Sequence, residues 1–357
     1  MALSVGVLTF GVLIVNLLFI MVNIQQKAVK ASTRAKLLTA LREDTGNPVS
    51  GAKLARDFGI SRVAIWKCIQ ALCGAGYHIE ATEAGYTLKA GKANDFLYPW
   101  EFGEREPLFR FINSAGSTMD KAREFALQGM AEGIIIAEKQ TRGRGRNNRT
   151  WASRQGGLYC TILDRPGITL ADYSLPAMLY QIAVARALST VCRKPARLRW
   201  PNDIYIDKRK IAGILTELEG EGDNISWISI GIGVNVNNAA PSGWAVSCAE
   251  LLKSPVSRRD LLLNIINEAE RLKKIAMSST AYSQGNRVLA DEWNSLADCT
   301  GAKVAVFASS QGGEHGRILA RGIFTGIDPA GRCIIKPEEE KGSLYFNPGP
   351  VSVVLGR

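Results

Sequence analysis

The stretch EKQTRGRGRNNRTW, from Glu138 to Trp151, places four arginines and two glycines between two apolar segments. GIIIAEKQ precedes the arginines and GLYCTIL follows them, and both segments are typical of β-strands. Glycines let a backbone approach a ligand closely, and guanidinium forks match the geometry of phosphate. Such a sequence also occurs in disordered basic tails. Its position between two strands of a folded domain favours an anion-binding loop instead.

Length and composition set the wider limits. The 357 residues exceed one average domain, so two or three domains are expected. The formal net charge of +11 favours anionic partners such as nucleic acid, nucleotides or acidic proteins. Seven scattered cysteines without a CxxC pair fit a reducing compartment. Only two histidines, His78 and His315, are present, which argues against a histidine-rich metal site or a histidine-based triad.

Residues 1–24 form an uncharged apolar segment, long enough to span a bilayer as a helix. The segment lacks the basic start and the cleavage pattern of a signal peptide, and basic residues follow it within 27–36. A start codon assigned too far upstream, with Met21 as the true start, explains the segment equally well. We therefore expect a cytoplasmic protein, with a membrane anchor only if residues 1–24 are translated.

Residues 31–90 predict a winged helix-turn-helix domain. One helix ends at Gly59 and a second begins at Ser61, which is the spacing of a helix-turn-helix. The second helix is expected to bury Ile65, Ile69 and Leu72. GYHIEAT and GYTL predict a two-stranded wing. A small helical cap with a solvated charged face is the alternative to DNA binding. The expected DNA-binding residues are of types that read the grooves of DNA: Ser61, Arg62, Trp66, Lys67 and Gln70.

The rest of the chain predicts two further domains after a linker at 89–106. In residues 107–297, short β-type runs often follow one another without a helix between them. This order favours a mixed sheet with helices on one face over a doubly wound parallel sheet. Residues 298–357 contain only short strand-like runs separated by turn residues, which predicts a small β-barrel. The fold class is therefore α+β with several domains.

Two more clusters accompany the arginine-glycine stretch. RLRWPNDIYI, from Arg197 to Ile206, has a proline that sets a turn after a strand and two polar residues at that turn. RKIAGILTELEG follows it, and Gly213 within this strand suggests that a ligand approaches the backbone closely. GIGVNVN ends a later strand with asparagines that can satisfy polar ligand atoms. None of these clusters is specific by itself.

Taken in order, SAGSTMDKAR, EKQTRGRGRNNRTW, RWPNDIYI, RKIAGILTELEG and IGIGVNVN resemble the biotin-protein ligases. The segment SGAKLARDFGISRVAIWKCIQALCGAGY resembles the amino-terminal module of those ligases that also repress the biotin operon. The resemblance runs from about Ala31 to the C-terminus. It implies a class II synthetase-like ligase domain and an SH3-like terminal barrel.

The resemblance also implies a chemistry. Family members use ATP and Mg²⁺ to adenylate biotin and release pyrophosphate, and then transfer biotin to a lysine of a biotin carboxyl carrier protein, as in acetyl-CoA carboxylase. A ligand-promoted homodimer would bind operator DNA of the biotin genes. Two anions meet in the first step, so catalysis depends on charge neutralisation and positioning, for which arginines and backbone amides suffice. No resident protein-bound metal site is expected.

Site residues carry over by position. The implied catalytic residues are Arg144 and Arg199. The implied biotin-binding residues are Ser117, Thr118, Met119, Gln140, Arg144, Gly145, Arg146, Arg199 and Gly213. The implied nucleotide-binding residues are Arg149, Trp151, Asn202 and Asn235.

Two departures from the family pattern affect these expectations. Asn147 and Asn148 replace an arginine and a glycine of the usual loop, and asparagine accepts left-handed backbone less freely than glycine. Arg199 replaces the lysine that in the family contacts biotin and phosphate, and arginine has a different shape. Three hypotheses remain open: a bifunctional ligase and repressor, a biotin or adenylate sensor without ligase activity, and an active ligase whose winged helix binds no DNA.

Overall fold

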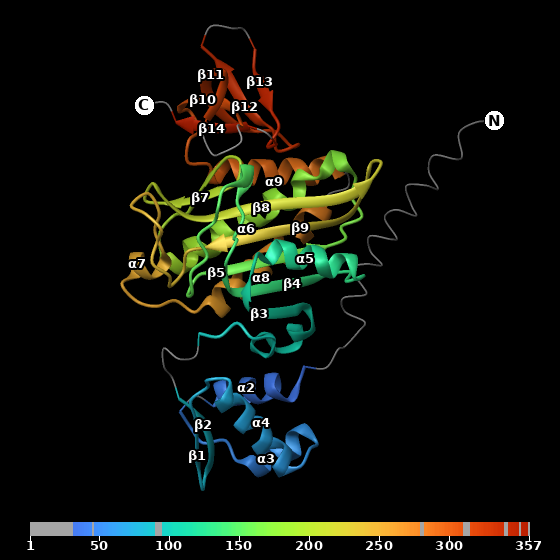
Figure 1. Ribbon diagram of the computed structural model, residues 1–357, viewed down its shortest axis with the longest axis vertical. Helices are drawn as coiled ribbons and strands as arrows, with labels where there is room; N and C mark the ends of the chain where they lie inside the picture. Colours follow the sequence, from blue (N-terminus) through green and yellow to red (C-terminus); the bar gives the residue numbers. More distant parts are fainter. Residues whose placement is uncertain are drawn as a thin grey trace, which may run out of the picture. The chain divides into compact units, whose positions relative to one another are not determined.

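The computed structural model describes residues 31–44, 46–89, 95–278, 282–309, 315–338, 342–349 and 351–355. The apolar segment 1–24 lies outside these ranges. The chain divides into two compact units: the first contains the residues up to Lys89 together with Phe102–Pro107, and the second contains the rest (Figure 1). Each unit is described by itself.

The first unit has the order helix, helix-turn-helix, hairpin. Its elements are α2 (Thr33–Glu43), α3 (Gly51–Phe58), α4 (Arg62–Gly74), β1 (Ile79–Thr82) and β2 (Gly85–Leu88). Gly59 ends α3 in the left-handed region at φ 66°, and the Ser61 side chain caps α4 by accepting a hydrogen bond from the Ala64 amide at 3.1 Å. The apolar stripe predicted for α4 is buried. The short turn and the two caps therefore produce the helix-turn-helix that the sequence predicts.

The hairpin of the first unit is the predicted wing. Its antiparallel register pairs Ile79 with Leu88 and Thr82 with Gly85. A bridge from Val49 to Tyr86 attaches the wing to the segment before α3. Gly85, at φ 141°, has the backbone of Val49 directly where a Cβ atom would lie, so only glycine fits there.

A seven-stranded mixed sheet is the centre of the second unit. Its strand order is β3-β4-β5-β9-β8-β7-β6, with β3 and β4 parallel and the other neighbours antiparallel. The strands are β3 (Phe109–Ala115), β4 (Gly133–Gln140), β5 (Leu158–Asp164), β6 (Arg197–Arg199), β7 (Asp203–Ile206), β8 (Arg209–Glu221) and β9 (Asn224–Val234). The predicted mixed sheet is confirmed.

Helices cover both faces of this sheet. On one face α5 (Thr118–Leu127) packs Ala122 and Ala126 against Ile135 and Leu163. Successive side chains of a strand point to opposite faces, and the alternate positions Ile134, Ile136 and Ile162 are buried as well. Helices α6 (Ser174–Cys192), α8 (Arg258–Ser278) and α9 (Tyr282–Leu296) pack together on that other side (Figure 1). The prediction that helices lie on a single face was wrong, because both side-chain sets of the central strands are apolar.

Helix α6 is a long and apolar segment of the chain. Among the described residues it is the one helix long and apolar enough to cross a bilayer, and more than half of it is buried inside the protein. A helix that packs against a sheet and against two other helices must be apolar on most sides. We read α6 as the core helix of this unit. The short helix α7 (Cys248–Leu252) follows β9.

The last part of the chain forms a five-stranded antiparallel sheet in the order β13-β12-β11-β10-β14. Its strands are β10 (Lys303–Ser309), β11 (His315–Ile327), β12 (Cys333–Pro337), β13 (Leu344–Phe346) and β14 (Val351–Leu355). Bulges interrupt the register after Val306 and after Phe324, and such bulges bend a sheet. This sheet belongs to the same compact unit as the seven-stranded sheet, and the domain boundaries predicted from the sequence stay predictions.

Within the segment predicted as a linker, residues 96–100 pack through aromatic rings. Tyr98 stacks on Phe96 and on Trp100 at ring distances of 5.4 and 4.7 Å, and meets Phe111 of β3 edge-on at 4.9 Å. These aromatic contacts hold residues 96–100 against the second unit. The sequence reading missed them because aromatic residues in an aperiodic segment give no regular pattern.

Candidate active site

Hydrogen bonds between side chains form the polar base of the site. Gln140, the last residue of β4, accepts hydrogen bonds from the Thr118 amide at 2.7 Å and from its hydroxyl at 3.1 Å. Its own amide group donates to Ser153 Oγ at 2.7 Å, and Thr161 donates to Thr118 at 2.8 Å. Ser117 accepts from the Met119 amide and so caps α5. This chain of bonds fixes the start of α5 to the end of β4 and to the middle of β5.

The arginine-glycine stretch forms a compact hairpin after β4. The Trp151 amide donates to Gly143 O at 2.9 Å, and the Gly145 amide donates to Arg149 O at 2.8 Å. A Cβ atom on Gly143 would collide with Trp151 O and with the Ser153 hydroxyl, so the return strand of the hairpin requires glycine there. The predicted loop between two strands is confirmed as ordered backbone.

The two asparagines that depart from the family pattern make the turn of this hairpin. Asn147 and Asn148 have φ values of 55° and 58°, both in the left-handed region. Asparagine enters that region at lower cost than other side chains because its short amide can bond locally. The turn therefore forms without the glycine that the family pattern contains.

Two arginines of the loop are held in different ways. Arg144 bonds to Glu217 Oε2 at 2.8 Å and lies 3.2 Å from Asp120 Oδ1, and 39% of its side chain is exposed. Arg146 donates to the carbonyl oxygens of Pro348, at 2.6 Å, of Gly349, and of Val351, at 3.2 Å. Burial lowers the pKa of Arg146 to about 10, so it stays protonated at neutral pH. Arg146 is a partly buried cation whose direct acceptors are neutral.

Trp151 lies across two glycines of the sheet. A Cβ atom on Gly213 would be 3.0 Å from the indole ring, and one on Gly233 would be 2.6 Å from its Nε1. The close approach that Gly213 permits is made here by Trp151, and the biotin-binding role of this glycine stays a prediction. Trp151 Nε1 is buried and has no hydrogen-bond partner among the described residues. It can donate to an acceptor atom of a ligand.

The WPND turn is tied to elements on both sides. Trp200 Nε1 donates to Gly331 O at 3.1 Å, and the Gln181 side chain of α6 donates to Pro201 O at 2.9 Å. Asn202 exchanges bonds with Ile214, through its backbone oxygen at 2.9 Å and its side-chain amide at 3.1 Å. The turn is thus rigid, and it connects the seven-stranded sheet with the terminal sheet.

The two cations next to this turn have separate partners. Arg199 Nε donates to Asp298 Oδ2 at 2.9 Å, its Nη2 bonds to the same oxygen, and the guanidinium lies 3.7 Å from the centre of the Tyr205 ring. Lys210 Nζ lies 2.7 Å from Asp203 Oδ1 and 5.2 Å from the ring centroid of Trp151. Lys210 belongs to the motif RKIAGILTELEG, but the sequence analysis assigns it no role.

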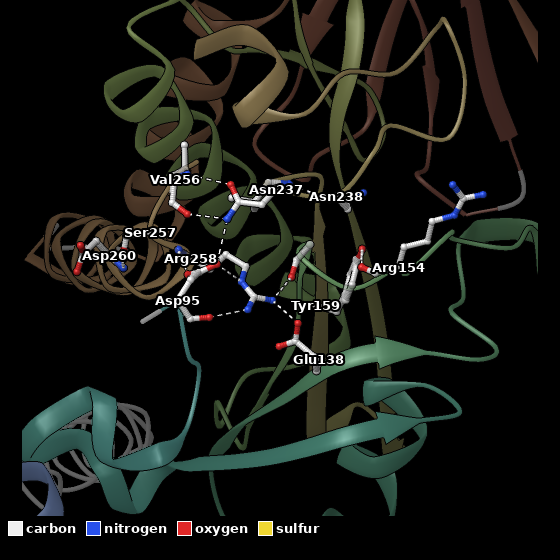
Figure 2. A network of polar contacts seen from close by, with 12 residues as sticks. Asp95, Glu138, Arg154, Tyr159, Asn237, Asn238, Val256, Ser257, Arg258 and Asp260 are labelled. Atoms are coloured by element: carbon white, nitrogen blue, oxygen red, sulfur yellow. Dashed lines mark hydrogen bonds and ion pairs between the residues drawn. The ribbon is translucent and has the colours of Figure 1, made fainter. Parts of the chain in front are cut away.

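Asn235 is hydrogen-bonded to Asn238, which lies beside a buried polar network around Arg258 (Figure 2). Its side-chain oxygen accepts from Asn238 Nδ2 at 3.0 Å, and the neighbouring Asn237 donates to Asp95 at 3.0 Å. Asp95 in turn accepts from Arg258, through Nε at 2.7 Å and the backbone amide at 2.8 Å. Arg258 is 4% exposed and also bonds to Glu138 at 2.9 Å. The network ties Asp95 and the residues that follow β9 to the start of α8.

The predicted site residues among these groups line one cavity of about 630 Å³. Every ligase-site residue predicted from the sequence lines it: Ser117, Thr118, Met119, Gln140, Arg144, Gly145, Arg146, Arg149, Trp151, Arg199, Asn202, Gly213 and Asn235. A second cavity of similar volume lies along other faces of the arginine-glycine loop and reaches Trp293 and Gly349. The individual roles of the residues stay predictions, but their common location is established.

The sequence reading missed other residues that line the first cavity: Asp203, Tyr205, Lys210, Trp244, Ser352, Val353 and Val354. Lys210 and Asp203 stand inside motifs that had been singled out, so their charge was a usable signal. Trp244 and the β14 residues stand in segments without a motif, and only the fold brings them to the site.

The predicted DNA-binding residues lie together on α4. Ser61, Arg62, Trp66, Lys67 and Gln70 are all exposed, with Trp66 at 51%. Ile65, Ile69 and Leu72 occupy the opposite, buried side of the helix. An exposed tryptophan between basic residues is unusual for a solvated helix face and suits a face that contacts a partner.

These two sites define a class of protein. Residues 108–235 match the family described as "Biotin/lipoate A/B protein ligase family", and residues 33–87 match "HTH domain". The fold is similar to that of a biotin protein ligase from Aquifex aeolicus solved with biotin and ATP. That comparison has a TM-score of 0.57 and 24% identity, and covers 70% of this chain and 99% of the other.

Curated relatives narrow the class. The protein is 37% identical over 216 residues to "Bifunctional ligase/repressor BirA" of Bacillus subtilis, a match that covers 58% of this chain and 66% of that protein. It is 30% identical over 210 residues to "Biotin--[acetyl-CoA-carboxylase] ligase" of Paracoccus denitrificans, covering 57% of this chain and 83% of that protein. The chain belongs to the biotin–protein ligase family and carries a helix-turn-helix domain in addition.

Proposed function

We propose that the protein is an ATP-dependent biotin–protein ligase that also represses transcription of biotin genes. It forms biotinyl-5′-AMP and transfers the biotinyl group to a lysine of a biotin carboxyl carrier protein. The observation that carries this proposal is the first cavity, which gathers all the ligase-site residues predicted from separate parts of the chain. Its relatives are named for the same two activities.

The first reaction joins two anions. A carboxylate oxygen of biotin attacks the α-phosphorus of ATP, the bond from that phosphorus to the bridging oxygen of the β-phosphate breaks, and pyrophosphate leaves. No proton moves, so the site needs cations and fixed positions more than an acid or a base. Arg146 fits this need, because its direct hydrogen-bond acceptors among the described residues are neutral carbonyl oxygens, and a ligand anion can neutralise its charge.

The second reaction transfers the acyl group. The neutral amine of the acceptor lysine attacks the acyl carbon, the bond to the AMP oxygen breaks, AMP leaves, and the nitrogen releases a proton to solvent. The intermediate is an anhydride that water would hydrolyse. The hairpin from Thr141 to Trp151 contributes residues 144–147 and 149–151 to the lining of the cavity, and its closure over a bound intermediate would keep water away.

Mg²⁺ would enter with the nucleotide. Asp203 is the one carboxylate among the described residues that line the first cavity, and the described residues contain no cluster of metal-ligating side chains. Mg²⁺ commonly keeps several water ligands and binds through one or two carboxylates together with substrate phosphates. The residues therefore fit a magnesium ion bound mainly to ATP, where it would neutralise phosphate charge, with Asp203 as its protein contact.

The N-terminal unit would bind operator DNA through α4. Arg62, Lys67 and Gln70 suit contacts with phosphates and base edges in the major groove. A ligand that favours a homodimer would place two such helices on a two-fold operator. Ligand-promoted dimerisation and a cytoplasmic location belong to this proposal. The seven cysteines, all free, agree with a reducing compartment.

One experiment separates the three hypotheses. The purified protein is incubated with labelled biotin, ATP, Mg²⁺ and an acceptor domain, and an acceptor with its target lysine changed to arginine is the control. We expect label only on the unchanged acceptor. If the acceptor carries no label above the control, the ligase hypothesis is contradicted and the hypothesis of a biotin or adenylate sensor without ligase activity remains. A footprint on DNA upstream of biotin genes, measured with and without biotin and ATP, tests repression; no footprint at saturating ligand would leave an active ligase with an idle winged helix.

A further inference from the structure

Two large apolar side chains are exposed on α4, the second helix of the helix-turn-helix. Val63 is 61% exposed and Trp66 is 51% exposed, whereas the core side of the same helix is buried. Residues three positions apart lie next to each other on a helix, so these two side chains form one apolar surface. Keeping this surface in water costs free energy, and contact with a partner removes that cost.

The charges around this pair indicate which partner fits. The exposed face of α4 consists of Arg62, Val63, Trp66, Lys67 and Gln70, and the helix contains no aspartate or glutamate. A polyanion is therefore attracted to the whole face. A second copy of this chain would set the same cations against themselves, which is unfavourable. The face suits duplex DNA, in agreement with the operator binding proposed above.

The apolar pair lies in the part of the helix that reaches the bases. The Ser61 side chain caps the N-terminus of α4, and Val63 follows within the first turn. In helix-turn-helix proteins, the N-terminal residues of the second helix contact base edges in the major groove. Thymine is the one base that carries a methyl group on this edge, and an apolar side chain recognises it by direct contact.

We propose that Val63 and Trp66 recognise the methyl groups of thymines in the major groove, so that the preferred DNA site has thymines at fixed positions. Arg62 and Lys67 bind phosphates, which adds affinity without choosing a sequence. This inference rests on the proposed DNA binding. It adds the base that is recognised and the side chains that recognise it.

The probe for the test is a DNA duplex that the full chain selects from a random-sequence library in the presence of biotin, ATP and Mg²⁺. Each thymine of this duplex is then replaced singly by deoxyuridine, which pairs in the same way and lacks only the methyl group. Fluorescence anisotropy at constant salt measures the dissociation constant. We expect the constant to rise about three- to fivefold at one or more positions, which is the effect of returning one methyl group to water.

Two alanine variants assign the methyl groups to side chains. Trp66→Ala and Val63→Ala should each weaken binding to the thymine duplex. Each should also bind the thymine and deoxyuridine duplexes equally at the position that it contacts, because the contact is already lost. Trp66→Phe keeps an aromatic ring and should keep part of the discrimination. A purely structural role of Trp66 predicts instead a lower melting temperature and an unchanged ratio between the two duplexes.

Two control variants make the result specific. Lys67→Met should weaken binding to both duplexes by the same factor and reduce the slope of the salt dependence by about one, as expected for a phosphate contact. Leu127→Ala truncates an apolar side chain of similar exposure, 68%, at the end of α5. It should change the dissociation constant by less than about twofold, with the discrimination intact.

The inference is overturned if every deoxyuridine duplex binds within about twofold of the thymine duplex, or if both alanine variants keep the full discrimination. A change of oligomeric state in Trp66→Ala without DNA would also overturn it, by assigning the face to a second copy. Failure of the proposed repressor looks different. The protein then enriches no sequence from the library, and the inference falls with that function.

Discussion

Arg258 and Arg146 are both withdrawn from water in part, and their surroundings differ. Arg258 is 4% exposed and faces the carboxylates of Asp95 and Glu138 (Figure 2). Burial alone would lower its pKa, but bonds to Glu138 and Asp95 raise it. Arg146 has only carbonyl oxygens as its hydrogen-bond acceptors among the described residues, and burial lowers its pKa. A cation neutralised by the protein stabilises the fold, whereas one left with neutral acceptors is available for a ligand anion.

The largest effect is expected where the charge is already neutralised. Arg258→Met leaves two carboxylates without their counter-ion, and breaking a buried pair in this way costs about 3–5 kcal/mol. The free energy of unfolding in urea measures the loss. Arg271→Ala is the control, because Arg271 pairs with Glu268 at 44% exposure and should cost about 1 kcal/mol or less. Similar losses for both variants would contradict the assignment of Arg258 as a structural arginine.

The loop arginine should show the reverse behaviour. Arg146→Ala removes a cation that the fold does not need for neutrality, so we expect adenylate formation to fall about 100- to 1000-fold. The free energy of unfolding should change by about 1 kcal/mol or less, since only bonds to exposed or partly exposed carbonyl oxygens are lost. Pyrophosphate release and urea unfolding are measured on the same preparation. A large loss of stability without a loss of rate would place Arg146 with Arg258.

Arg144 is the intermediate case, since it has carboxylate partners but stays partly exposed. Glu217→Gln removes the nearer charge, and a partly exposed pair of this kind contributes about 0.2–1 kcal/mol. We therefore expect a small loss of stability, together with tighter binding of a non-hydrolysable biotinyl-adenylate analogue because Arg144 is freed. Calorimetry measures the binding. Weaker binding would show that Glu217 holds Arg144 in its productive position.

The smallest effect concerns the turn of the loop. Asn148→Gly restores the glycine of the family pattern at φ 58°, where glycine has no steric cost. The gain in the closed loop is offset by the greater freedom of glycine in the open loop, so the net change should be within about 1 kcal/mol. The dissociation rate of the analogue, followed by stopped flow, should change by a factor of about five or less. Asn148→Ala is the control, and it should speed dissociation because alanine resists this conformation.

The sequence predicted the site better than its details. Motifs at Ser117, Arg144, Trp151, Asn202 and Asn235 marked residues that the fold brings to one cavity. The resemblance of these motifs to the biotin-protein ligases made this possible, because the site residues carry over by position. The winged helix was equally readable, since its caps and its buried stripe are local features.

The sequence did not predict which charged residues far apart in the chain pair with one another. Nothing near Arg199 in the sequence indicates Asp298, 99 positions away, and nothing near Asp95 indicates Arg258. The sequence analysis also missed that helices cover both faces of the central sheet. An apolar residue in a strand does not indicate which helix packs against it. Pairing of charges between distant segments depends on the three-dimensional path of the chain, which local patterns do not contain.

The hydrogen bonds that fix Arg146 join residues that are synthesised at different times. Its acceptors Pro348 and Val351 follow it by 202 and 205 positions. At synthesis rates of about 5–20 residues per second, these residues leave the ribosome roughly 10–40 s after the loop itself. A nascent chain could complete the seven-stranded sheet in that interval, yet its loop would lack the partners that fix it. Competence for catalysis would then arise late in translation, well after the catalytic sheet has been made.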